Sequence, residues 1–203
     1  MIQALPKVEL HCHVEGTMRP ETVAELAAAA GIALPTEDPR DLYRFSNLTE
    51  FLEAFWLVQA TLTDRDAWAR LAYESVVDGA AHGLVHRETF FTPARHLQSG
   101  QQLADIVAGL DEGFERAERE TGVTVRLIFD IDRDVGPAPA VAHVAELGEL
   151  RRRGARGADR VIGVGMDSTE LGSDPASFAE AYAIAGAAGL RLTAHQGENS
   201  PAA

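Results

Sequence analysis

The feature that most constrains the fold is an alternation of short, apolar β-type runs with longer stretches of helical periodicity. Such alternation favours βαβ units and a parallel sheet over other fold classes. Residues 31–47, richer in Pro, Asp and Arg, are predicted to form a long loop with one short helix, either a lid over a site or a surface loop. The predicted strands span residues 7–13, 84–91, 123–131, 160–166 and 190–195. The predicted helices span residues 20–30, 48–60, 64–81, 101–121, 137–153 and 175–188.

The amino-acid composition of the chain limits the kinds of molecule that it is expected to bind. The 203 residues, 46% hydrophobic and 24% charged, are typical of one globular domain, so residues 1–203 are expected to form a single domain. Eighteen basic against 31 acidic residues give a net charge of −13, which disfavours nucleic acid and membrane surfaces as partners. The single cysteine, Cys12, and an N-terminus unlike a signal peptide predict a cytoplasmic setting. No run approaches the ~20 apolar residues of a membrane helix.

The segment VELHCHVEG contains the first candidate chemistry. Side chains alternate along a strand, so Glu9, His11 and His13 are predicted to share one face, while the residues between them share an apolar face against helices. In an α/β barrel the polar face would meet the interior, near the C-terminal mouth where such folds place their sites. Two neutral imidazoles there suit zinc. Two ordinary structural histidines are the alternative at this point.

A second motif, TAHQGEN, follows the last predicted strand. It places His195 and Glu198 at the same mouth. A third histidine would complete a set of nitrogen ligands, and a glutamate three residues later can transfer a proton without binding metal, as metal-assisted hydrolysis requires.

A third segment, GVGMDSTELG, links a predicted strand to a turn. It lacks the glycine spacing of a dinucleotide-binding or P-loop motif. Gly165 is predicted to let the backbone approach a ligand. Asp167 either orients neighbouring groups by hydrogen bonding or caps the turn.

Together, PKVELHCHVEGT, GVGMDSTELG and TAHQGE resemble the signature segments of the adenosine and adenine deaminases, zinc enzymes of the amidohydrolase superfamily built on a (β/α)8 barrel. The resemblance implies that His11, His13 and His195 bind one Zn²⁺ per chain. It implies that Glu198 protonates the purine ring nitrogen next to the attacked carbon. It also implies that the backbone of Gly165 contacts another ring nitrogen.

The same resemblance implies a substrate and a reaction. Glu15 is expected near the entrance of the site, where the family recognises a sugar or packs the purine. Asp167 is also expected to bind the substrate. The segment HRETFFTPARHLQSG resembles the adenine deaminase branch. The implied reaction is hydrolytic deamination of a small aminopurine or its nucleoside, adenosine to inosine or adenine to hypoxanthine, with release of ammonia in purine salvage.

The family pattern continues with a strand ending in His-Gly and another ending in Asp-Asp, and neither occurs in this sequence. We therefore expect an incomplete (β/α)8 barrel of about five βα units, truncated at its C-terminus. An open barrel edge would favour self-association.

Two alternatives remain at this stage. One is a catalytically incomplete remnant or scaffold, which would lack the later segments. The other is an amidohydrolase acting on a different substrate through two metals bridged by a carboxylated lysine. The single lysine, Lys7, lies at the wrong end of its strand for that role. A cytidine-type zinc deaminase is excluded, because its signature needs more than one cysteine.

Overall fold

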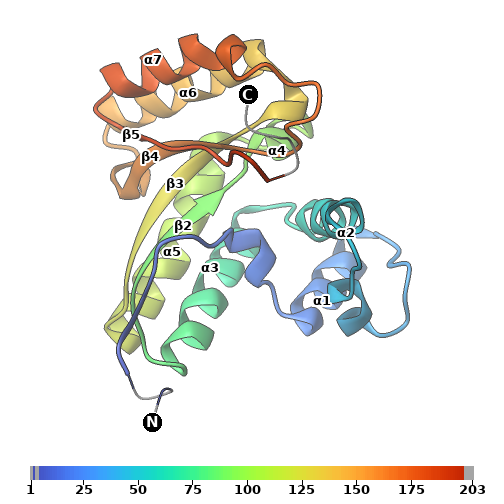
Figure 1. The fold of residues 1–203 in the computed structure, drawn as a ribbon. Helices are drawn as coiled ribbons and strands as arrows, with labels where there is room; N and C mark the ends of the chain where they lie inside the picture. The colour runs from blue at the N-terminus through green and yellow to red at the C-terminus, as the bar shows by residue number, and fades with distance from the viewer. Residues whose placement is uncertain (1, 3–4, 199–203) are drawn as a thin grey trace.

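A parallel sheet whose strand order follows the chain organises the structure (Figure 1), a computed structural model that describes residue 2 and residues 5–198. Each neighbouring pair of strands is parallel. Sequential parallel strands joined by helices are the arrangement of a (β/α) barrel wall, so the predicted fold class is confirmed. The strands are β1 (Lys7–Glu9), β2 (Leu84–Phe91), β3 (Thr124–Asp132), β4 (Val161–Asp167) and β5 (Arg191–Leu192).

Six of the seven α-helices of the described residues fall into three groups in Figure 1: α3 with α5 beside β2 and β3, α6 with α7 beside β4 and β5, and α1 with α2 apart from both. Local signals explain several of their ends. The side chains of Asn47 and Asp64 cap α2 and α3, and Gly31 and Gly122 end α1 and α5 in the left-handed region. The α-helices are α1 (Pro20–Ala30), α2 (Leu48–Ala60), α3 (Arg65–Ala80), α4 (Ala94–Gln98), α5 (Leu103–Thr121), α6 (Pro137–Arg152) and α7 (Ala179–Ala187). Short 3-10 helices span Val14–Thr17, Pro39–Tyr43, Arg133–Val135, Ala158–Arg160 and Pro175–Phe178.

The core lies where α3 and α5 pack against the sheet. Its largest fully buried side chains include Trp68, Phe91, Phe114 and Phe129. The two helices approach closely at Gly113, where an added Cβ would lie 2.1 Å from a main-chain carbonyl oxygen of α3. Burial of large apolar side chains, both aromatic and aliphatic, supplies most of the driving force for this packing.

Both edge strands are shorter than predicted, and this corrects the expected placement of the first motif. Strand β1 ends at Glu9, so His11 lies beyond it, although His13 returns to pair with Phe90 as an isolated bridge. Among the described residues, β1 pairs with β2 alone, and a strand with one neighbour has fewer bonds to hold it. Leu10 was predicted to face helices, but it is 59% exposed.

The helices of the structure differ from the predicted helices in two places. The predicted helix over 175–188 is divided into a 3-10 turn and α7, and the short helix α4 was not predicted. Pro175 begins the 3-10 turn, where its fixed φ is tolerated.

Strand β5 pairs with β4 alone within the described part of the chain. The expected truncation of the barrel at its C-terminus stays a prediction, and residues 199–203 lie outside the described residues. Over the described residues, none of the helices combines the length and apolarity needed to cross a bilayer.

Candidate functional site

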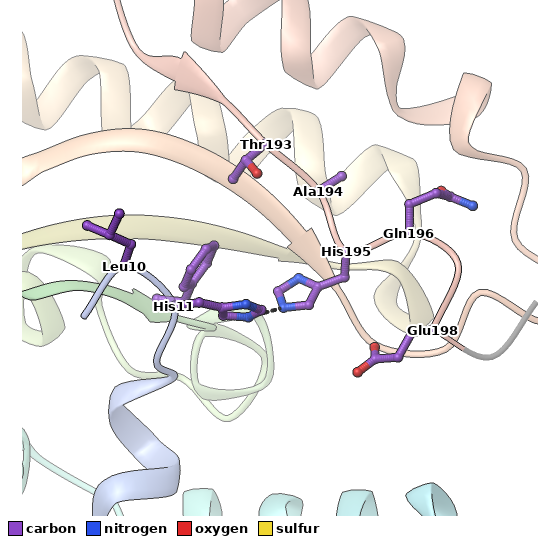
Figure 2. A pocket seen from close by; sticks show the side chains of 8 residues that line it. Leu10, His11, Thr193, Ala194, His195, Gln196 and Glu198 are labelled. Atoms are coloured by element: carbon purple, nitrogen blue, oxygen red, sulfur yellow. Dashed lines mark hydrogen bonds between the residues drawn. The ribbon is translucent and has the colours of Figure 1, made fainter. Parts of the chain in front are cut away.

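Three histidines from the two ends of the chain converge at the C-terminal ends of the strands. Nε2 of His195 lies 2.7 Å from Nε2 of His11 and 3.1 Å from Nε2 of His13. Figure 2 shows the rings of His11 and His195 pointing toward each other, with the Glu198 side chain directed into the space beside them. The structure therefore brings together the three predicted metal ligands.

The orientation of His195 is set by the preceding strand. Its main-chain N–H and its ring Nδ1 both bond the carbonyl oxygen of Met166 at the end of β4, at 2.9 and 3.0 Å. A proton on Nδ1 leaves the lone pair on Nε2, which faces the other histidines. Burial lowers the pKa of His195, so the neutral, ligating form is favoured.

His13 is the most deeply buried of the three. Its ring stacks on Phe90, with centroids 5.2 Å apart and planes inclined by 21°. Burial, assisted by the two neighbouring histidines, lowers the pKa of His13 to about 3. Its Nδ1 lies 3.7 Å from an oxygen of Asp130 and 3.8 Å from an oxygen of Asp167. His13 is therefore neutral, with carboxyl groups beside the nitrogen that does not face the other rings.

A buried acid cluster, formed by Glu15, Asp130 and Asp167, lies beneath the histidines. Thr92 binds two of its members: its N–H donates to Glu15 at 2.7 Å, and its hydroxyl donates to Asp167 at 2.6 Å. Burial raises the pKa of Glu15 to about 7 and that of Asp167 to about 8. Burial and the neighbouring acids raise the pKa of Asp130, whose oxygens find no hydrogen-bond partner among the described residues.

Two cavities meet at the histidines. One, of about 170 Å³, is bounded by His11, His13 and His195 together with Asp167, Ser168 and Glu198. Its opposite wall is apolar and comes from α2: Leu48, Phe51, Leu52, Phe55 and Trp56. The second, of about 400 Å³, lies on the side of Leu10, Phe90 and residues 193–196, and Glu198 also lines it (Figure 2).

The donor set fits a zinc ion. Three imidazoles whose Nε2 atoms converge are ligands that zinc prefers. Cys12 is not part of the set: its thiol donates to the carbonyl of His13, and burial raises its pKa to about 11, which keeps it protonated.

The predicted catalytic residue, Glu198, and the predicted substrate-binding residues lie at different depths relative to the cavity. Glu198 and Asp167 line the 170 Å³ cavity. Glu15 was expected near the entrance, but it is fully buried and does not line this cavity, because its carboxyl group accepts a hydrogen bond from the main chain of Thr92 in the interior. Gly165 lies inside β4, where an added Cβ would be 2.0 Å from an oxygen of Asp130, so this glycine leaves room for the Asp130 carboxyl group. Contacts of Glu15, Gly165 and Asp167 with a substrate stay predictions.

Sequence reasoning missed several residues that shape the site. Asp130 interrupts the apolar run LIFDID near the end of a strand, which is where barrel enzymes place functional groups, and this signal could have found it. Arg133, Glu170 and the aromatic side chains of α2 carried no comparable local signal. Their partners lie far away in the sequence.

The chain is similar to known proteins over nearly its whole length. The sequence model of the adenosine deaminase family matches residues 6–203. The adenine deaminase of Rhodospirillum rubrum is 42% identical over 98% of this chain and 59% of its own length. The chain thus spans less than two thirds of this relative.

Solved structures show the same similarity. An adenine deaminase from Arthrobacter aurescens superimposes with a TM-score of 0.85 at 33% identity, over 97% of this chain and 59% of that one. An amidohydrolase from Burkhoderia ambifaria, solved with bound Zn, gives a TM-score of 0.85 at 36% identity, over 97% of this chain and 53% of that one.

Proposed function

The chain belongs to the adenosine deaminase family, and from that membership we propose that it carries the metal- and purine-binding centre of a zinc-dependent aminopurine deaminase. The reaction replaces the exocyclic amine of the purine by oxygen and releases ammonia. The observation that carries the proposal is the convergence of three histidines beside a cavity with an aromatic wall and a glutamate.

His11, His13 and His195 would hold the zinc ion. The bound zinc in the amidohydrolase neighbour supports this assignment. When bound, zinc lowers the pKa of a coordinated water from about 15.7 toward about 7 and so supplies a nucleophile at neutral pH. The carbonyl of Met166 holds His195 in the tautomer that ligation needs.

The chain's own side chains bind and protonate the purine in this proposal. Phe51, Phe55 and Trp56 offer flat apolar surfaces to a planar base and exclude water from it. Glu198, at the boundary of both cavities, gives a proton to a ring nitrogen next to the attacked carbon. Asp167 contacts the purine from the strand side, above the buried Glu15.

Adenine is the first substrate to test, because the relative with 42% identity and the Arthrobacter neighbour are both named adenine deaminases. The assay compares ammonia release from adenine and adenosine by the zinc-loaded chain, with purine binding measured by calorimetry. We expect adenine to be bound and deaminated in preference to adenosine. A chain that binds zinc stoichiometrically but neither binds nor deaminates either purine would contradict the proposal.

The role of Glu198 is tested by Glu198→Gln, which keeps the shape of the side chain but loses its transferable proton. We expect turnover to fall by roughly 10²–10⁴-fold, the usual contribution of a general acid or base, with zinc content unchanged. Glu180→Gln, an exposed carboxylate on α7, is the matched control. Wild-type turnover in Glu198→Gln would remove Glu198 from the mechanism.

The cytoplasmic setting and self-association through an open sheet edge stay predictions. Self-association is supported by two exposed apolar side chains on the edge strands: Val8 on β1 is 57% exposed and Leu192 on β5 is 51% exposed. Analytical ultracentrifugation tests it: a monomer at all concentrations would contradict it.

A further inference from the structure

The loop after β4 carries a carboxylate that binds the turn containing Glu198. Glu170 is only 7% exposed. Its side chain accepts hydrogen bonds from the main-chain N–H groups of Gly197 and Glu198, at 2.9 and 2.6 Å. It also accepts a bond of 2.8 Å from the side-chain amide of Gln196. One carboxylate therefore binds three consecutive residues of the turn.

The loop after β4 and the turn at residues 196–198 each contain a residue with a positive φ. Ser168, directly after β4, has a φ of +68°, a left-handed conformation that disfavours a residue with a side chain. Gly197 adopts a φ of +79° within the opposing turn. Strained backbone of this kind persists where surrounding contacts enforce it, and such positions cluster at functional sites. Arg133 bonds the main-chain carbonyl of Ser168, and Glu170 bonds the main-chain N–H of Gly197.

Both oxygens of the Glu170 side chain take part in these contacts, and all three donors are N–H groups. Hydrogen bonds from N–H donors to a carboxylate are shorter and roughly twice as strong as those between neutral groups. The bonds reach the main chain of Glu198 itself, so they fix the Cα–Cβ direction from which its side chain enters the cavity. Glu170 does not line the 170 Å³ cavity, so it acts from behind the turn.

We propose that Glu170 is a positioning residue that locks the 196–198 turn and so keeps the Glu198 carboxyl group aimed at the substrate. The consequence for catalysis rests on the proposed function. The locking of the turn does not, because it can be measured without turnover.

The experiment compares Glu170→Ala and Glu170→Gln with Glu180→Ala as the control. Three readouts are used: amide hydrogen exchange at Gly197 and Glu198, the χ1 rotamer of Glu198 from NMR couplings, and kcat and KM for adenine. Thermal melts verify folding. Glu170→Gln keeps one side-chain oxygen as acceptor, so it tests whether a conservative variant rescues the loss.

In Glu170→Ala we expect exchange at both amides to rise at least ~10-fold and the Glu198 rotamer to become averaged. We expect kcat to fall roughly 10–100-fold, the usual effect of losing an outer-shell partner, with KM changed by less than about threefold. Glu170→Gln should lie between wild type and Glu170→Ala in all three readouts. Glu180→Ala should match wild type.

Several results would overturn the proposal. A fixed Glu198 rotamer and wild-type exchange in Glu170→Ala would show that the turn does not depend on Glu170. A raised KM with unchanged kcat would make Glu170 a substrate contact instead. Loss of folding in Glu170→Gln would leave a purely structural role. If the wild-type chain binds zinc but does not deaminate, the proposed function fails, while exchange and rotamer data still decide whether Glu170 positions Glu198.

Discussion

The guanidinium group of Arg133 donates a hydrogen bond to the main-chain carbonyl of His195, 62 positions further along the chain. The same side chain donates to the carbonyls of Asp167, at 3.3 Å, and Ser168, at 3.0 Å. Arg133 is 5% exposed. One buried cation therefore joins the ends of β4 and β5 and holds a candidate metal ligand through its backbone.

Replacing Arg133 with Gln removes this connection. We expect zinc affinity to fall about 10-fold, at the lower end of the range for outer-shell partners, because His195 gains freedom relative to the other two histidines. Competition with a chromogenic chelator measures the affinity. Arg44→Gln is the control, since the Arg44 side chain is 80% exposed. An affinity within twofold of wild type would show that Arg133 does not support the ligand set.

Zinc should stabilise the wild-type fold and not the fold of His195→Ala. A ligand that binds only the folded state adds about 2.7 kcal/mol at 100 times its Kd. Urea unfolding with and without zinc measures this difference. Because the three Nε2 atoms converge, loss of one ligand should weaken binding at least as much as loss of an outer-shell partner, ~100-fold or more. Stoichiometric tight zinc binding by His195→Ala would contradict the assignment.

Gly165→Ala should destabilise the protein by about 1–3 kcal/mol, as overpacking does in a filled core. The new methyl group would lie 2.0 Å from the Asp130 carboxylate and 3.1 Å from the Phe90 ring. Gly186→Ala in α7 is the matched control, since its Cβ would meet nothing within 4 Å. Helix propensity predicts that this control gains up to about 1 kcal/mol. Urea unfolding compares the two, and equal stabilities would refute the steric argument.

His96 should make the metal-free protein less stable in acid. Burial lowers the pKa of His96 from 6.5 to about 4, so between these values the unfolded state binds more protons than the folded state. Stability from this group is therefore complete above pH 6.5 and is lost as the pH falls toward 4. From pH 7.5 to pH 5 the loss is about 2 kcal/mol.

The variant His96→Gln isolates this contribution. Between pH 7.5 and pH 5 the free energy of unfolding of His96→Gln should fall less than that of wild type. The difference between the two decreases should be close to the whole contribution of His96, about 2 kcal/mol. Urea unfolding in the presence of a chelator measures both proteins. Parallel pH profiles would show that His96 is not held neutral by its buried site against Trp68.

Elements with strong local signals were predicted closely from the sequence. Strand β2 and helices α1 and α2 have the predicted bounds. An apolar run, a proline at the first turn of α1 and an asparagine cap on α2 account for this agreement. Strands β1 and β5 were predicted too long, because their extent depends on a neighbouring strand and not on their own residues.

The residues of the candidate site also differ in how far the sequence alone could predict them. His11, His13, His195 and Glu198 stand in short motifs, so their convergence could be anticipated once the strands were assigned to one barrel mouth. Glu170 and Arg133 act on partners 28 and 62 positions away, across two strand ends. Local periodicity contains no information about such partners.

The convergence of His11 and His195 has a mechanical consequence. Their strands, β1 and β5, stand at opposite ends of the strand order, and four spacings of about 4.8 Å would separate them by about 19 Å in a flat sheet. Their Nε2 atoms are nevertheless 2.7 Å apart. The curvature of the sheet therefore helps to bring these two candidate ligands together, so a motion that flattens the sheet would separate them. Zinc binding at the proposed site should therefore oppose flattening of the sheet.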